Sequence, residues 1–218
     1  MTLAEWKERE REQRCNDILD VAMKLFYEKG YDAVSMSDIA EKVGLKKPTL
    51  YLYFKNKDAL FFAIVLRGAT FRNPLVQKEA EKGKTGAEKL GAATRALGVF
   101  NAKYPEYNWA DYYFRSGKFD LTDLENRDIK KILDMQREMF DIIASCIKAG
   151  MADGTYLSDA DPLGVAVLIT MVVEGSFNLR PDFAYVLDSG GVSREKFAMD
   201  TARLMRRAIA GDPKKKGH

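Results

Sequence analysis

The sequence predicts an all-α protein, in which an N-terminal three-helix domain of the helix-turn-helix type precedes a larger helical domain. Apolar residues recur at helical spacing along most of the chain, and capping and stop residues divide this pattern into segments. We find no stretch with the alternation of apolar and polar residues that a strand requires. The 218 residues include only 16 glycines and 6 prolines, which leaves room for long helices.

The first predicted helix has one apolar face and ends at Gly30, after Lys29. That face is formed by Ile18, Ala22, Leu25 and Phe26. The segment 6–14 before it alternates acidic and basic residues, so we interpret it as an exposed helical extension or a loose arm.

Two short helices follow and are joined by a glycine turn. Ser35 and Asp38 form a capping-box pattern at the start of the second helix, and Gly44 can adopt the left-handed conformation that ends it. Pro48 suits the first turn of the third helix, where a missing N–H costs nothing. The pair spans 35–54, which are the dimensions of a DNA-binding helix-turn-helix.

The fourth helix is predicted from Lys57 to Pro74, where the proline kinks or ends it, and 78–86 is predicted as a loop. Thr122 with Glu125 opens a long helix that Gly150 closes. The helices expected after the loop cover 87–103, 106–114, 123–149, 162–179 and 193–209.

The surface of the third helix favours DNA as a partner. Between Lys42 and Lys57 the sequence has lysines at 42, 46, 47, 55 and 57 and no acidic residue. Leu50, Phe54 and Leu52 are expected to anchor the helix. The opposite face can donate hydrogen bonds to phosphates or base edges. From the spacing alone, ordinary packing of a helical hairpin is an equally good interpretation.

Composition excludes several kinds of site. The only histidine is His218, which argues against a histidine-dependent triad or a typical zinc enzyme. Cys15 and Cys146 fit no metal-ligand spacing, and we interpret them as free thiols rather than a redox switch. We therefore expect no enzyme activity, no metal and no cofactor. The formal net charge of +3 identifies no partner by itself.

The run 39–60 resembles the signature of the TetR family of transcriptional regulators, and the close resemblance covers residues 16–66. The matching elements are Phe26, Gly30-Tyr31, Ser35, Ile39-Ala40, Gly44, Leu50-Tyr51, Phe54 and Lys57. The resemblance implies a DNA-binding surface formed by Ser35, Ser37, Lys46, Lys47, Pro48, Thr49, Tyr51, Tyr53 and Lys57. For Ser35 a purely capping role is an equal alternative. Ser37 stands where many relatives have arginine, which puts one contact in doubt.

The resemblance also implies the organisation of the chain, with a DNA-binding domain at 1–56 and a ligand-binding and dimerisation domain at 57–218. The predicted helix 162–179 is apolar nearly all round and must be covered on every side. Burial within one protomer is possible, but we favour a homodimer seam formed with the helix 193–209.

A group of aromatic and methionine residues is a candidate wall for a pocket that takes an apolar or aromatic effector. We name Phe100, Trp109, Tyr112, Tyr113, Met135, Met139 and Phe140. For each one an ordinary core position is the main alternative. Glu174, in an otherwise apolar helix, either has a structural partner or recognises the ligand.

These expectations describe a ligand-responsive regulator, a repressor in our interpretation, that binds a palindromic double-stranded operator as a dimer and is released by a small molecule. A helical enzyme using Glu174 and a constitutive DNA-binding protein are the alternatives. The longest apolar stretch, 165–173, is about half of a bilayer span. No apolar run follows the N-terminal basic residues. We therefore expect a cytoplasmic protein without membrane contact.

Overall fold

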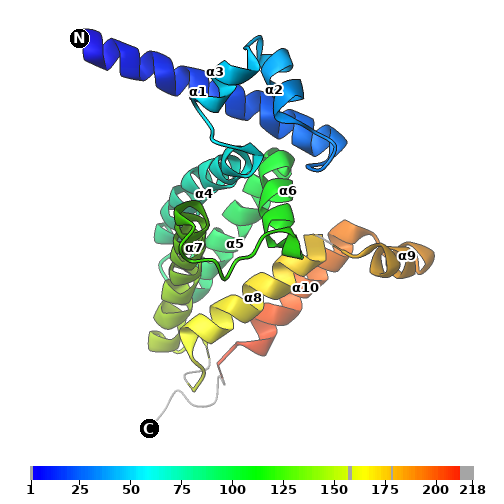
Figure 1. Ribbon diagram of the computed structural model, residues 1–218. Helices are drawn as coiled ribbons and strands as arrows, with labels where there is room; N and C mark the ends of the chain where they lie inside the picture. The colour runs from blue at the N-terminus through cyan, green and yellow to red at the C-terminus, as the bar shows by residue number, and fades with distance from the viewer. Residues whose placement is uncertain (1, 157–158, 178, 212–218) are drawn as a thin grey trace. The chain divides into compact units, whose positions relative to one another are not determined.

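The computed structural model describes residues 2–156, 159–177 and 179–211, without the side chains of Val173, Glu174 and Phe177. The described chain is helical, as the sequence predicts, and its one β-type pairing is an isolated bridge between Tyr156 and Ala210 (Figure 1). It forms two compact units. Unit 1 comprises Met1–Arg72 and Val99–Met135, and unit 2 comprises Asn73–Gly98 and Gln136–His218. This division differs from the expected functional boundary after residue 56, which stays a prediction.

Unit 1 holds the predicted helix-turn-helix and the start of the long helix that follows it. Its elements are α1 (Leu3–Lys29), α2 (Met36–Val43), α3 (Lys47–Tyr51), the first part of α4 (Lys57–Glu81), the end of α5 (Gly86–Lys103), α6 (Pro105–Tyr113), the π-helical turn η1 (Phe114–Lys118) and the start of α7 (Arg127–Ala152). The exposed segment 6–14 is part of α1, so the helical extension is correct and the loose arm is not.

Phe61 of α4 is at the centre of the unit 1 core and is fully buried. Five aromatic rings lie within 6.2 Å of its ring, measured between centroids. They belong to Phe26, Tyr31, Trp109, Tyr113 and Phe119. We call these six residues the aromatic cluster. Most of these pairs with Phe61 meet edge to face, the arrangement that aromatic quadrupoles favour.

Unit 2 is built from the end of α4 and from five later helices, two of which it contains only in part. Besides the end of α4, its elements are most of α5 (Gly86–Lys103), most of α7 (Arg127–Ala152), α8 (Pro162–Phe177), α9 (Pro181–Ser189) and α10 (Arg194–Ala208). Asn73 is fully buried and its side-chain amide donates a hydrogen bond to Glu138, 2.9 Å away. Because a buried amide needs a partner, this bond fixes α4 against α7.

Three boundaries of α4 and α7 differ by more than two residues from those expected. α7 begins at Arg127, because the Asn126 side chain caps it, whereas the Thr122 hydroxyl bonds Asp120 in a turn. α7 also passes through Gly150 to Ala152. α4 continues through Pro74 to Glu81, so the proline does not end it.

α9 was not predicted, because the sequence analysis placed no helix between 179 and 193. Proline suits a first helical turn, and here Pro181 begins α9. α9 leaves Phe183, Tyr185 and Val186 exposed, so it lacks the buried apolar face from which a helix is predicted.

Among the described helices, α4 has the length and apolar composition to cross a membrane. More than half of its apolar stretch (56%) is buried inside the protein. Core helices of soluble proteins share these properties, so α4 is explained by its place in the core of unit 1.

Candidate nucleic-acid interface

The turn between α2 and α3 is fixed by the residues that predicted it. Gly44 adopts the left-handed conformation, with φ 76° and ψ 29°, and ends α2. The backbone N–H of Leu45 then donates to the carbonyl of Ala40 at 2.8 Å. Ile39 of α2 and Leu50 of α3 are both fully buried. These contacts set the angle between the two short helices and leave the outer face of α3 free.

That outer face has the composition expected of a DNA-reading helix. Lys46, Lys47 and Pro48 are exposed at its start, and Tyr51 is 43% exposed. Thr49 and Tyr53 are half-buried. Lysine, threonine and tyrosine supply hydrogen-bond donors for phosphates and base edges. The structure therefore brings the predicted positions of α3 together on one surface.

Leu52 is a correction to the sequence analysis, which expected it to anchor α3. Its side chain is 78% exposed. α3 ends at Tyr51, and the N–H of Phe54 donates to the carbonyl of Leu50, so the chain turns there and buries Phe54 instead. Leu50 and Phe54 are sufficient to hold the helix.

Lys57 has partners inside the protein. Its ammonium donates to the carbonyls of Tyr31 and Val34, both at 3.0 Å, and lies 4.2 Å from the centroid of the Tyr31 ring. These bonds hold the segment that leads into α2. An ammonium carries three N–H groups, so one remains for a phosphate. The DNA contact that the resemblance implies for Lys57 stays a prediction.

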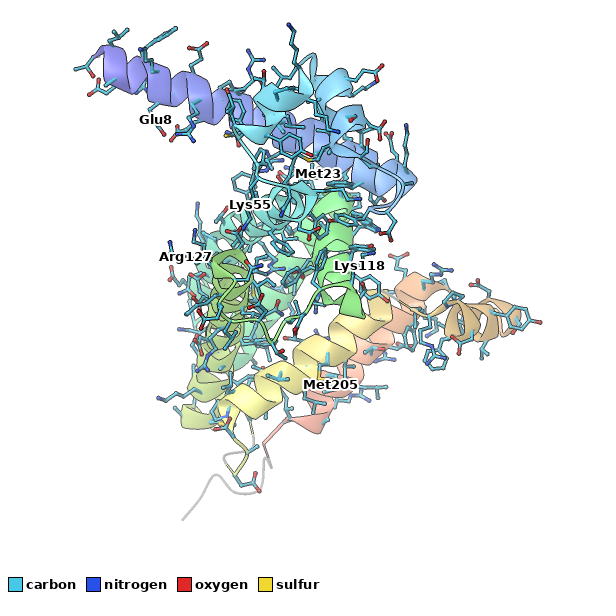
Figure 2. The ribbon with its side chains drawn as sticks, in the orientation of Figure 1. Glu8, Met23, Lys55, Lys118, Arg127 and Met205 are labelled. Carbon is cyan, nitrogen blue, oxygen red and sulfur yellow. The ribbon has the colours of Figure 1, made fainter. Side chains whose placement is uncertain are left out.

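The same segment is tied to the end of α6 and to η1. Asp32 accepts hydrogen bonds from the Tyr113 hydroxyl at 3.1 Å and from the Lys118 ammonium at 2.6 Å (Lys118 is labelled in Figure 2). The Lys118 bond, followed by the Tyr113 bond, lowers the pKa of Asp32. The Tyr31 hydroxyl donates to Asp58, and burial followed by this bond raises the pKa of Tyr31. The carboxylates of Asp32 and Asp58 therefore help to hold the segment that leads into α2.

Ser35 forms the predicted capping box with Asp38. Its hydroxyl accepts from the Asp38 N–H at 3.2 Å and donates to the Asp38 carboxylate at 2.6 Å. The carboxylate also accepts from the Ser35 N–H at 2.7 Å, and these donors lower the pKa of Asp38. The Ser35 hydroxyl hydrogen is thus already engaged, whereas Ser37 is exposed beside it.

We expect Ser35→Ala to lower the free energy of unfolding by about 1 kcal/mol, the usual effect of losing a serine N-cap. Urea denaturation followed by circular dichroism measures this change. Ser37→Ala is the matched control, because its exposed side chain does not cap the helix, and it leaves the unfolding midpoint unchanged. Equal effects of the two substitutions would contradict the capping role.

The residues named for an effector pocket are divided between the two units. In unit 1, Trp109 and Tyr113 stack within the aromatic cluster, Phe100 is buried against Tyr107, and Tyr112 is exposed. Met135, also in unit 1, is half-buried. In unit 2, Met139 is buried and Phe140 is half-buried. Glu174 is in α8, but its side chain lies outside the described residues.

Unit 2 contains a cavity of about 410 Å³ that the sequence analysis missed. Side chains of α5, α8 and α10 line it, among them Leu90, Thr94, Ile169, Ala202 and Met205. Among the described side chains, the predicted effector residues do not line it. No local pattern marks such a cavity, because its walls come from three helices that are distant in sequence.

The predicted dimer helices expose apolar side chains within unit 2. Leu168 and Met171 of α8 are 51% and 66% exposed, and Met199 and Leu204 of α10 are also exposed. In the described protomer, α10 buries none of its residues. The expectation that α8 must be covered on every side is therefore not met within one protomer.

Comparison with known proteins agrees with this geometry. Residues 18–64, which contain the helix-turn-helix, match the model for bacterial regulatory proteins of the tetR family. The transcriptional repressor ComR of Escherichia coli is 53% identical over 49 residues, which are 22% of this chain and 23% of that protein. The transcriptional activator FasR of Mycolicibacterium smegmatis is 37% identical over 87 residues, 40% of each chain. The match thus spans less than half of these curated relatives.

Solved structures match over most of the chain. A tetR-family regulatory protein from Rhodococcus RHA1 has a TM-score of 0.72 and 20% identity, over 91% of this chain and 98% of that one. A TetR/AcrR-family transcriptional regulator from Thermobifida fusca has a TM-score of 0.68 and 25% identity, over 89% and 97%. The helix-turn-helix segment 18–64 is thus matched in sequence by the tetR family of bacterial regulatory proteins, and the fold of the chain is matched by solved structures of TetR-family regulators.

Proposed function

We propose that this protein is a cytoplasmic transcriptional repressor that binds a palindromic operator as a homodimer and leaves it when a small molecule binds. The observation that carries the proposal is the outer face of α3. It presents Lys47, Pro48 and Tyr51 to solvent on a helix anchored by Leu50 and Phe54, in a segment that lacks acidic residues from 42 to 57. Such a face suits a major groove, where phosphate oxygens and base edges accept hydrogen bonds.

The exposed apolar faces of α8 and α10 support dimerisation. Exposed side chains such as Leu168 and Met171 cost free energy in water and are covered when two copies pair through the same faces. A two-fold dimer presents two copies of α3, which explains why we propose a palindromic operator.

The cavity of unit 2 supports a small-molecule effector. Its volume of about 410 Å³ is within the range of ligand sites, and its walls are mainly apolar. We propose this cavity as the effector site, and a contribution of the aromatic residues named from the sequence stays a prediction. A ligand releases DNA if it binds more tightly to a dimer whose two α3 helices are wrongly spaced for the operator than to the DNA-binding dimer.

The test is selection of duplexes from a random-sequence library by the purified protein, followed by anisotropy titration at two salt concentrations. We expect a palindromic consensus whose affinity exceeds that for a scrambled duplex by at least about 10³ and falls steeply with salt. A small-molecule library is then screened for release of this duplex. Failure to enrich any sequence would overturn the proposal.

Tyr51→Ala is expected to weaken binding to the selected duplex by about 10- to 100-fold, the range for losing one good groove contact. The 43% exposed side chain supports little of the core, so thermal unfolding stays unchanged. Tyr185→Ala, at an exposed tyrosine of α9 in unit 2, is the matched control and retains wild-type affinity. Unchanged affinity of Tyr51→Ala would remove α3 from the groove.

A further inference from the structure

The N-terminal half of α1, residues 3–14, is helical although every one of these side chains is exposed. A capping box begins it, since the Thr2 hydroxyl accepts from the Glu5 N–H and the Glu5 carboxylate accepts from the Thr2 N–H. The segment extends for about 18 Å, and Figure 1 shows it projecting beyond α2 and α3. Burial does not account for this segment, and its whole surface is open to an external partner.

Charges on this segment are sorted by helix face. Lys7, Arg11 and Arg14 follow an i, i+4, i+7 pattern and share the face of Ile18. Ile18 is fully buried in the helix-turn-helix core. The basic stripe therefore continues along the side of α1 that faces α2 and α3.

Three of the four acidic residues lie on a different face, whereas Glu10 is beside the basic stripe. Glu5, Glu8 and Glu12 are turned by roughly 90–150° from the centre of the basic stripe, and Figure 2 labels Glu8 on this exposed part of α1. Residues 3–14 carry equal numbers of acidic and basic side chains. A generally basic arm would attract any anion, whereas here only the helical arrangement creates a basic surface.

The basic stripe forms one wall of a groove beside the recognition helix. The groove measures about 580 Å³ and is lined by Lys7, Glu10, Arg11, Arg14, Leu45, Thr49, Leu52 and Tyr53. In the described structure the three cations of the stripe form no ion pair. Thr49 and Tyr53 bring hydroxyl groups to the opposite wall, and Glu10 is the single carboxylate.

We propose that this groove holds one sugar-phosphate strand of the duplex, next to the major groove that α3 enters. The inference rests on the proposed function, because α3 must first lie in the major groove. Arg11 and Arg14 bind phosphate oxygens from the α1 wall, and the hydroxyls of Thr49 and Tyr53 donate from the other. Leu52 packs against the sugars, which gives its exposed side chain a partner.

Two features of the groove favour a DNA strand over an acidic protein surface as its partner. Both walls of the groove supply donors, and one wall belongs to the helix that reads DNA. A phosphodiester strand accepts hydrogen bonds along its whole length without sequence information. The stripe therefore raises affinity equally for all sequences and leaves the operator preference to α3.

The test compares Arg11→Ala/Arg14→Ala, the single variants and the matched control Arg9→Ala, with the duplex selected by the wild-type protein and a scrambled duplex. Arg9 is on the same exposed helix, on the side away from the basic stripe. For each variant, Kd is measured by anisotropy from low to moderate salt. Circular dichroism checks that α1 remains helical.

We expect the double variant to reduce the slope of log K against log salt by about 1.8 per protomer, since each lost phosphate contact contributes about 0.9. Affinity falls by the same factor for the selected and the scrambled duplex, and Arg9→Ala retains the wild-type slope. An unchanged slope in the double variant, or an equal loss in Arg9→Ala, overturns the inference. If the wild-type protein selects no duplex, the proposed function itself fails, so the two failures are distinguishable.

Discussion

Met171→Glu is expected to separate the proposed homodimer into protomers and to weaken operator binding by a factor of about 10² to 10⁴. Met171 is 66% exposed in the protomer and shares an apolar face of α8 with Leu168. A carboxylate there stays solvated in the protomer, but in a two-fold interface two copies are desolvated near each other. Linkage of the two recognition helices is then lost, and with it the gain from bivalent binding.

Analytical ultracentrifugation and anisotropy titration measure the two parts of this expectation. Leu124→Glu is the matched control, because it introduces the same charge in place of an apolar side chain that is 59% exposed in the loop before α7. The control remains dimeric and binds with wild-type affinity. A Met171→Glu protein that is still dimeric would show that the protomers pair through another surface.

The helix-turn-helix was predictable nearly to the residue because its signals are local. Ser35, Gly44 and Pro48 each act within one turn of the chain, and all three occupy the predicted positions. Leu52 was assigned incorrectly because helical periodicity was extended past Tyr51, where α3 ends. The two carbonyl partners of Lys57 were also unpredictable, since Tyr31 and Val34 approach it only after folding.

In the second half of the chain most helices were predictable, but α9 and the cavity of unit 2 were not. The N-cap at Ser193 correctly places the start of α10, whereas Thr122 does not place the start of α7. Capping patterns are ambiguous where Asp, Asn and Thr cluster, as they do at 120–126. The cavity of unit 2 depends on three helices, and the apolar composition of its walls resembles any core. Composition alone indicated the aromatic residues as the candidate pocket wall instead.

Phe61→Ala tests whether the aromatic cluster is a tightly packed core or the lining of a pocket. Phe61 is fully buried, and the five other rings of the aromatic cluster surround it. Truncation removes the ring and leaves a cavity that rigid aromatic neighbours cannot fill. We expect the free energy of unfolding to fall by about 3–5 kcal/mol, as measured by urea denaturation.

Phe71→Ala is the matched control on the same helix, because its side chain is 57% exposed and its ring meets that of Tyr107 edge to face. Its cost is expected to be below about 1 kcal/mol. A comparably small cost for Phe61→Ala would mean that the cluster packs loosely, as the lining of an effector pocket does. Trp109 and Tyr113 would then become the better candidates for effector contact, in place of the cavity of unit 2. A large cost assigns both residues to the core that supports the entry to α2, where Tyr113 also donates to Asp32.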